Sequence, residues 1–307
     1  MSIVSTSTSA FYERSRASMK DLRLQAESMQ AQLGSGEKLS RSSDDPVAAS
    51  RLRTLSRLET LSSIDKSNAD RANADMSLAD SAMSNMATSI IRAQELATKA
   101  ASSTLTSSQR TNIADELGQI QTDLMTLANS RDSNGHALFG GESTGNAYEL
   151  DASGNAVYVG TDSSDTLPIG EGQTVPRSVT GKQIFEFTDA NGNTTDVMAT
   201  IKALSDALKS GTGDPGSLSN DALASLKTGL DTLTTTQTVV GTRLAWLDTV
   251  AERRTNLSEL RTKEKSDLGG VDIASTYASL QETLTVLQAS QASFTKLANL
   301  SLFNNLN

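Results

Sequence analysis

The sequence contains no cysteine, which excludes disulfide bonds, thiolate metal ligands and a cysteine nucleophile. It contains a single histidine, His136, so a site built from several histidines is excluded as well. Aromatic residues make up only 4% of the 307 residues, which argues against one large conventional core. Alanine, serine, threonine and leucine dominate instead, and this composition favours long, thin helical bundles.

Long apolar runs and an excess of positive charge are also missing. No apolar run reaches the roughly 18 residues of a membrane-spanning helix. Residues 1–15 lack the basic segment and the long apolar run of a cleavable secretory signal. The formal net charge of −9 argues against binding to nucleic acid. We therefore expect neither a membrane nor a nucleic acid among the partners.

The C-terminal segment 268–307 is almost uncharged, with Asp272, Glu282 and Lys296 as its only charged side chains. Its apolar residues recur at alternating steps of four and three, which is typical of a coiled-coil seam with one polar break. The other faces carry small and polar residues rather than charges, so we expect nearly the whole circumference to be buried in an assembly of several chains. The predicted seam consists of Ile273, Tyr277, Leu280, Leu284, Leu287, Gln291, Phe294 and Ala298.

A first helix is predicted from about residue 7 to residue 33, where Gly34 and Gly36 end it. Its seam has the same three-four step: Tyr12, Ser15, Met19, Leu22, Ala26, Met29 and Leu33.

A second, long helix should follow, because Asp45 is a good cap residue and Pro46 is favoured at the first helical position. If it reaches about residue 101, it is on the order of 80 Å long. Its seam should contain Ala69, Ala72, Met76, Ala79, Met83, Met86, Ile90, Ala93, Ala97 and Ala100.

Two further helical segments show the same three-four spacing of apolar residues. The shorter one contains Ile113, Leu117, Ile120, Leu124 and Leu127. The longer one is predicted to begin after Leu218 and to run to the glycine pair Gly269-Gly270. Its seam is predicted at Leu223, Leu226, Leu230, Leu233, Gln237, Val240, Leu244, Leu247 and Ala251, with a register shift before Leu257 and Leu260.

The middle of the chain changes character. Closely spaced turn signals between residues 135 and 196 predict a small β-rich region. AVYVG (156–160) and QIFEF (183–187) resemble short strands, DANGN (189–193) resembles a tight hairpin turn, and a short helix is predicted over 197–208. Residues 141–235 hold 5 basic and 13 acidic side chains, so this region carries nearly all of the net negative charge.

The predicted fold is therefore mainly α with a small β-rich insert. The N- and C-terminal regions form a long antiparallel helical bundle or coiled coil, and the β-rich domain lies at the opposite pole. We predict three parts: a terminal coiled coil (1–44 and 268–307), a long helical rod (45–134 and 218–267) and an acidic β-rich insert (135–217).

Three stretches resemble the flagellin superfamily. Residues 33–52, LGSGEKLSRSSDDPVAASRL, are similar to its N-terminal signature. Residues 134–145 resemble its glycine-rich turn, although His136-Ala137 replaces the usual basic–aromatic pair, and residues 271–290 resemble its C-terminal signature. The Asp-Asp-Pro sequence is similar to the hook–filament junction branch, since flagellins more often carry Asp-Asp-Ala. The signature residues are Ser35, Gly36, Asp44, Asp45, Pro46, Phe139, Gly140 and Gly141.

The resemblance implies a non-enzymatic building block without cofactor or metal. Family members leave the cell unfolded through the flagellar type III export pathway, without signal cleavage, and their termini become ordered on assembly. The implied location is the extracellular flagellum. The implied partners are other copies of the chain in a ring or helical layer, the neighbouring hook-associated junction protein, flagellin at the filament base, and the export chaperone and export gate. We expect the assembly interface to include Leu22, Met29, Leu33, Ile273, Tyr277, Leu280, Leu284, Leu287 and Phe294.

Two other functions fit the same sequence: a flagellin-type filament subunit, and a surface binding module whose active part is the acidic insert. An enzyme is disfavoured. For His136 a surface loop position is favoured over catalysis, because the sequence shows no nucleophile or orienting partner beside it. For Asp44 and Asp45 helix capping is favoured over acid–base or metal chemistry. The basic run Arg253, Arg254, Arg261, Lys263 and Lys265 is interpreted as a solvated face, with an inter-subunit contact as the alternative.

Overall fold

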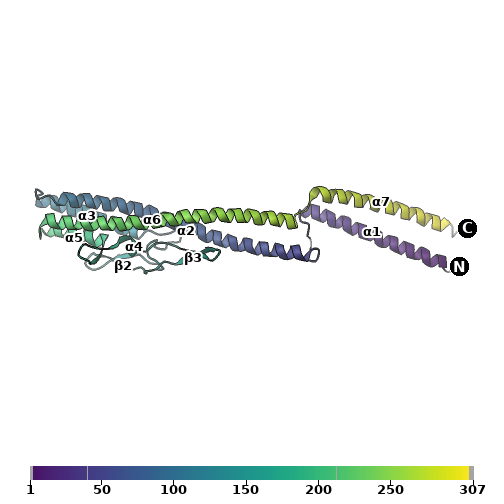
Figure 1. Ribbon diagram of the computed structural model, residues 1–307, viewed down its shortest axis with the longest axis horizontal. Helices are drawn as coiled ribbons and strands as arrows, with labels where there is room; N and C mark the ends of the chain where they lie inside the picture. Colours follow the sequence, from purple (N-terminus) through teal and green to yellow (C-terminus); the bar gives the residue numbers. More distant parts are fainter. Residues whose placement is uncertain (1–2, 40, 212, 304–307) are drawn as a thin grey trace. The chain divides into compact units, whose positions relative to one another are not determined.

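Long helices dominate the computed structural model, which describes residues 3–39, 41–211 and 213–303 (Figure 1). Two helices of 55 residues each, α2 (Pro46–Ala100) and α6 (Pro215–Gly269), connect two compact units. We call the unit formed by residues up to 60 and from 256 onward the terminal unit, and the unit formed by residues 61–255 the central unit. The predicted class, mainly α with a small β-rich insert, is confirmed.

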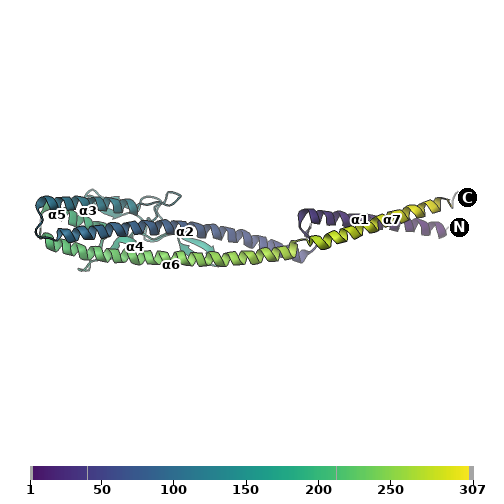
Figure 2. The same cartoon turned by 90° about the horizontal axis from the view of Figure 1, so that it is seen from above.

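The core of the central unit lies along α2, on the face that the sequence predicts. All ten predicted seam positions between Ala69 and Ala100 are buried, and Met76, Met83, Met86 and Ile90 are at most 1% exposed. These methionines are therefore core residues, as predicted. Alpha-helices α2 and α6 lie side by side and antiparallel (Figures 1 and 2), with Gln237 Nε2 donating to Asp80 Oδ1 at 3.0 Å.

Helix α6 begins three residues earlier than predicted, at Pro215, and its seam changes register near residue 250. The positions from Leu226 to Leu247 are buried or half-buried as predicted, but Ala251 is exposed and Val250 is buried in its place. The predicted register shift therefore occurs, and it occurs one turn earlier than the sequence suggests.

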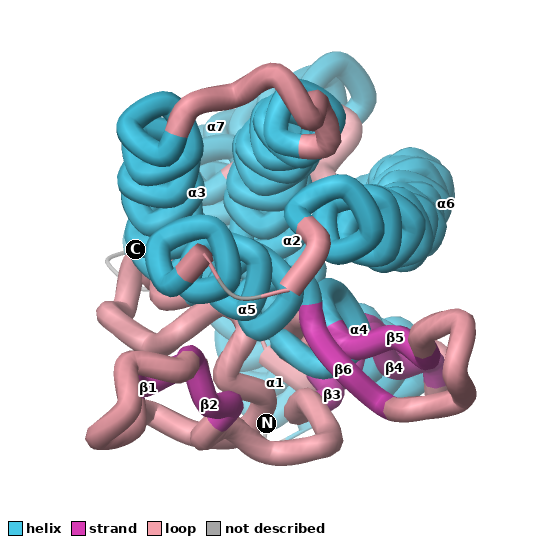
Figure 3. The backbone as a smooth tube through the Cα atoms, turned by 90° about the vertical axis from the view of Figure 1, so that its left-hand side faces the viewer, coloured by secondary structure: helices cyan, strands magenta, loops and turns pink. Residues whose placement is uncertain are grey.

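Two shorter helices complete the helical part of the central unit. Helix α3 (Ser107–Ala128) buries Ile113, Leu117, Ile120 and Leu124 as predicted, and it starts with a Thr106/Gln109 capping box. Helix α5 (Val197–Ser210) packs on α3, where Ser205 Oγ donates to the carbonyl of Ala114 at 2.7 Å. Figure 3 shows the strands on one side of these helices.

The insert contains three separate two-stranded antiparallel sheets rather than one sheet. They pair β1 (Tyr148–Leu150) with β2 (Ala156–Tyr158), β3 (Thr166–Gly170) with β4 (Gln173–Pro176), and β5 (Glu186–Thr188) with β6 (Thr194–Asp196). AVYVG is a strand as predicted over its first three residues, and DANGN is the β5–β6 turn.

The prediction of one strand over QIFEF is wrong in its first half. Residues Gly181–Phe185 form a short helix, α4, and only then does β5 begin. The cause is local, because Thr180 and Gln183 form a capping box that satisfies the first backbone donors of a helix.

Three turns of the insert region share one construction, in the segments DSNGH (132–136), DASGN (151–155) and DANGN (189–193). In each turn the aspartate Oδ1 accepts from the backbone N–H groups two and four residues later. The glycine in the fourth place has a φ between +75° and +84°, which glycine adopts without steric cost. Only the first of these turns contributes to the ion-pair cluster described below.

In the terminal unit, α1 (Ile3–Ser35) packs antiparallel against α7 (Ile273–Phe303). Of α1 residues 3–9 and α7 residues 298–303 only the backbone is described, so the predicted seam residue Ala298 lies outside the described side chains.

Candidate functional site

The segments 36–38 and 269–271 meet in the terminal unit, although more than 230 residues separate them in the sequence. The backbone N–H of Lys38 donates to Gly269 O at 2.7 Å, and that of Val271 donates to Gly36 O at 3.1 Å. Gly36 has a φ of +73°, which allows the chain to turn directly after α1. The loop after α1 and the linker before α7 therefore form one hydrogen-bonded connection.

Side chains of α2 and α6 reinforce this connection. Arg51 and Glu264 form a two-bonded ion pair, with Nε to Oε1 at 2.5 Å and Nη2 to Oε2 at 3.0 Å. Lys265 Nζ lies 3.3 Å from Glu59 Oε2. A Cβ added to Gly270 would lie 2.5 Å from the carbonyl oxygen of Ser266, so the linker requires glycine there.

Asp44 and Asp45 have structural roles in the same loop. Asp45 Oδ1 accepts from the N–H groups of Val47 and Ala48 at 3.1 and 2.9 Å, and it thereby caps α2 ahead of Pro46. Asp44 Oδ2 accepts from the N–H of Arg41 at 2.8 Å and closes the preceding turn. Asp45 therefore caps the helix as predicted, whereas Asp44 stabilises the turn before it instead of capping α2.

On α1 the predicted seam is the face that packs against α7. Tyr12, Met19, Leu22, Met29 and Leu33 are half-buried and Ala26 is buried, whereas most of their neighbours are exposed. Tyr12 contacts Phe294 edge to face with ring centroids 5.3 Å apart, and its hydroxyl donates to Leu297 O at 3.3 Å. A groove of about 580 Å³ runs along this pair between Phe11 and Leu297.

On α7 the packed face differs from the predicted seam. Leu280 is buried and Leu284, Leu287 and Phe294 are half-buried, in agreement with the prediction. Ile273 and Tyr277, however, are 66% and 55% exposed, and Gln291 is exposed. The packed face uses Thr276 and Ser290 in place of Tyr277 and Gln291, and it includes Thr283 beside Leu284. These lie one residue, or about 100° around the helix, from the predicted positions.

A broad apolar stripe on α7 is therefore only half covered by α1. The large apolar side chains that stay at least 44% exposed in this unit's helix pair are Phe11, Leu24, Ile273, Tyr277, Val286 and Leu297.

The glycine turn of the signature, Phe139-Gly140-Gly141, anchors the insert to the end of α3. Phe139 is completely buried, and its carbonyl accepts from Gly181 N at 2.8 Å and from the Tyr158 hydroxyl at 3.2 Å. Gly140 O accepts from Thr161 N at 3.1 Å. The carbonyls of this turn thus bind two separate parts of the insert, residues 158–161 and Gly181.

Gly141 is the strictest position of this turn. Its φ is +69°, and an added Cβ would lie 2.5 Å from the carbonyl oxygen of Ser163 and still closer to Thr161 Oγ1. We expect Gly141→Ala to lower the free energy of unfolding by at least about 1–3 kcal/mol, the cost of a strained backbone position. Urea denaturation of the full chain measures this loss. Gly145→Ala is the matched control, because its nearest neighbour would be 3.7 Å away; equal losses in the two variants would contradict the assignment.

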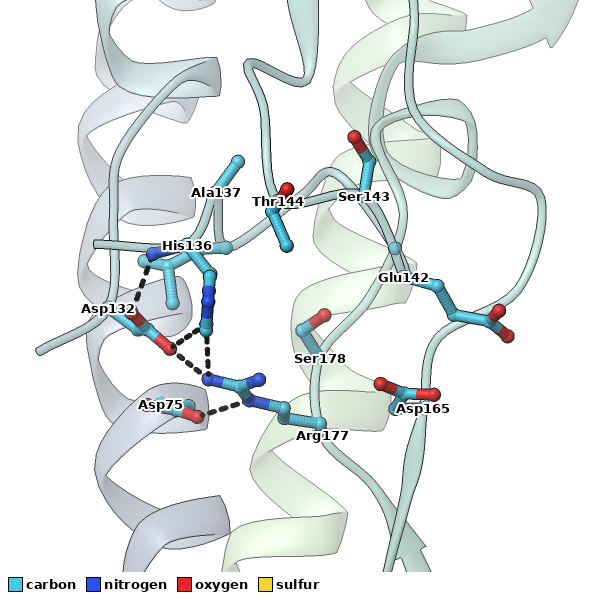
Figure 4. Close-up of a pocket in the computed structure, with 12 residues that line it drawn as sticks. Asp75, Asp132, His136, Ala137, Glu142, Ser143, Thr144, Asp165, Arg177 and Ser178 are labelled. Carbon is cyan, nitrogen blue, oxygen red and sulfur yellow. Dashed lines mark hydrogen bonds and ion pairs between the residues drawn. The ribbon is translucent and has the colours of Figure 1, made fainter. Parts of the chain in front are cut away.

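A buried ion-pair cluster, which the sequence analysis missed, joins three distant segments (Figure 4). Arg177, after β4, donates from Nε to Asp75 Oδ2 on α2 at 3.0 Å, and from Nη2 to Asp132 Oδ2 in the turn after α3. The side chains of both aspartates are 2% exposed and that of Arg177 is 22% exposed. His136 lies beside them and lines the same pocket of about 110 Å³.

The charge of Asp132 is fixed by its surroundings. Burial alone raises the pKa of this carboxyl, but the backbone N–H groups of His136 and Asn134 and the positive charge of Arg177 outweigh it. The pKa of Asp132 therefore lies below its ordinary value. The stability that the ionised group contributes is present above the ordinary aspartate pKa, and it is lost as the pH falls through the lowered pKa.

The basic run on α6 is only partly a solvated face. Arg254 Nη2 donates to Ile169 O at 2.7 Å, and Arg253 pairs with Glu171, so both hold the β3–β4 hairpin. Lys265 pairs with Glu59. The interpretation as a solvated face is therefore wrong for the half-buried Arg254, whereas Arg253 and Lys265 are exposed members of surface ion pairs.

The described residues contain no group of three or more potential ligands that could hold a metal ion. Within the same residues no helix is both long enough and apolar enough to cross a membrane.

A family model described as "Bacterial flagellin N-terminal helical region" matches residues 5–144. Residues 5–144 are therefore similar to the N-terminal helical region of bacterial flagellins.

Nearly the whole chain is similar to flagellar hook-associated protein 3. It is 28% identical to that protein of Salmonella typhimurium LT2, with 97% of this chain and 98% of the relative covered. It is also 28% identical to that of Escherichia coli K12, with 89% and 90% covered. The fold is similar to that of a putative flagellar hook-associated protein from Vibrio parahaemolyticus, with a TM-score of 0.68, 21% identity, and 74% of this chain and all of that chain covered.

Proposed function

We propose that this protein is a structural subunit of the bacterial flagellum that assembles with copies of itself as an adaptor layer at the hook–filament junction. Its similarity to hook-associated protein 3 extends over nearly the whole chain. The observation that carries the proposal is the half-covered apolar stripe of α7. Ile273 and Tyr277 are large apolar residues that α1 leaves exposed, as expected for surfaces that neighbouring copies bury.

This assignment gives each part of the chain a different place in the layer. Residues 1–44 and 268–307 form the inner part of the layer and gain their full order from neighbouring copies. Residues 45–134 and 218–267 form the helical part, and the acidic insert 135–217 faces outward. The chain has no catalytic role in this proposal, and its cluster of buried charges serves to hold the insert.

The proposed partners follow from the position of the layer between hook and filament. On one side the layer contacts the neighbouring hook-associated junction protein, and on the other it contacts flagellin at the filament base. Before assembly the chain is held by the export chaperone and passes the export gate of the flagellar type III pathway without signal cleavage. Its final location is outside the cell.

Labelling the protein in the intact flagellum tests this assignment. Electron microscopy should show the label as one short band between hook and filament. A label along the whole filament would instead identify a flagellin-type subunit, and so would long filaments grown from the purified chain alone on seeds. A label elsewhere on the cell surface would favour the binding module.

A further inference from the structure

The only histidine of the chain lies between an arginine and an aspartate that bind each other. His136 Nδ1 is 3.4 Å from Arg177 Nη2 and 3.6 Å from Asp132 Oδ2. The side chain of His136 is 42% exposed through the pocket in Figure 4, whereas that of Asp132 is 2% exposed. A proton can therefore reach the imidazole from solvent, while the charges that respond to it are buried.

The two protonation states of the imidazole require different partners. With its proton on Nε2, the neutral ring can accept a hydrogen bond from Arg177 at Nδ1. The protonated ring is a cation with donors only, and the guanidinium then repels it. Its nearest acceptor is Asp132 Oδ2, the oxygen that Arg177 Nη2 already uses.

The other charged groups around the ring do not remove this competition. Asp75 faces Arg177 from α2 and holds Nε at 3.0 Å, so it keeps the guanidinium near α2. Glu142 and Asp165 are the other charged residues that line the pocket, and both are acidic. We propose that protonation of His136 transfers Asp132 from Arg177 to His136, and so loosens the segment after β4 from the turn of residues 132–141.

Two backbone hydrogen bonds hold the segment that loosens, and exchange of their amide protons reports on its attachment. The N–H of Arg177 donates to Asp165 O, and the N–H of Gly181 donates to Phe139 O, both at 2.8 Å. The second bond joins this segment to the glycine turn that anchors the insert. The consequence is a β-rich insert whose attachment depends on pH. This inference does not depend on the flagellar role.

Hydrogen–deuterium exchange of the full chain at pH 8 and pH 5.5 tests the proposal. After correction for intrinsic exchange, protection of peptides that cover residues 176–181 should fall by on the order of tenfold at the lower pH. The midpoint should coincide with protonation of the imidazole, followed by its Hε1 proton NMR signal, which belongs to His136 because the chain has one histidine. Peptides that cover the buried residues of α3 are the internal reference, and their protection should not change.

His136→Gln keeps a polar side chain that cannot titrate in this range, so it should remove the pH dependence of residues 176–181. His136→Lys, with a permanent positive charge, should show the low protection already at pH 8. The proposal is overturned if wild type shows no change, if His136→Gln changes as wild type does, or if the exchange and imidazole midpoints differ. Thermal unfolding at pH 8 establishes that both variants are folded.

Discussion

Ile273→Asp and Tyr277→Asp should each abolish incorporation into the flagellum and leave the isolated protein nearly as stable as wild type. The two side chains are 66% and 55% exposed on α7, and exposed substitutions usually change the free energy of unfolding by less than about 0.5 kcal/mol. In an assembled layer the same carboxylates would be buried without partners, at a cost of several kcal/mol each. An acidic residue at position 273 also lies in the first turn of α7, where it suits the helix dipole.

The measurement combines thermal unfolding of the purified variants with complementation of a strain that lacks the protein, scored by motility and by filaments in electron micrographs. Leu150→Asp is the matched control, because Leu150 is 59% exposed but lies in the insert, and filaments should form normally. Leu280→Asp is the contrasting variant, since Leu280 is 6% exposed and packs within the α1–α7 pair. Normal filaments with both Ile273→Asp and Tyr277→Asp would show that this face of α7 is not an interface.

Arg177→Met should cause the largest loss of stability, about 3–5 kcal/mol in the free energy of unfolding at pH 7, because it leaves Asp75 and Asp132 buried without their shared cation. Removing Arg177 also takes away one of the interactions that lower the pKa of Asp132, while burial, which raises it, remains. Protonation then relieves an unpaired charge, so the deficit relative to wild type should shrink as the pH falls from 7 to 4.

Urea denaturation across this pH range measures both effects. Arg253→Met is the matched control, since Arg253 and Glu171 form an exposed pair, 51% and 55% exposed, whose loss should cost no more than about 1 kcal/mol. A deficit for Arg177→Met no larger than that of Arg253→Met would mean that the cluster does not hold the insert.

Some features of this protein could be predicted from the sequence because they depend on local rules. The seam of α2 is one, since a strict three-four repeat of apolar residues leaves the helix one face to bury. The cap at Asp45-Pro46 and the hairpin turn at residues 189–193 are others, because a few adjacent side chains determine each of them. The signature stretches also pointed to the superfamily without any coordinates.

The structure was needed where two faces of a helix could pack equally well. It was also needed where interacting residues lie far apart in the sequence. On α7 either Tyr277 and Gln291 or Thr276 and Ser290 could flank the line of Leu280, Leu287 and Phe294. The packing of α1 covers the second pair. Arg177 meets Asp132 and Asp75 across 45 and 102 residues, and no periodicity encodes such a contact. The sequence by itself therefore determined which helices form and which side of most of them is apolar. Only the tertiary structure decided which apolar side chains remain exposed and which charges are buried together, because burial depends on the neighbours that folding brings to each residue.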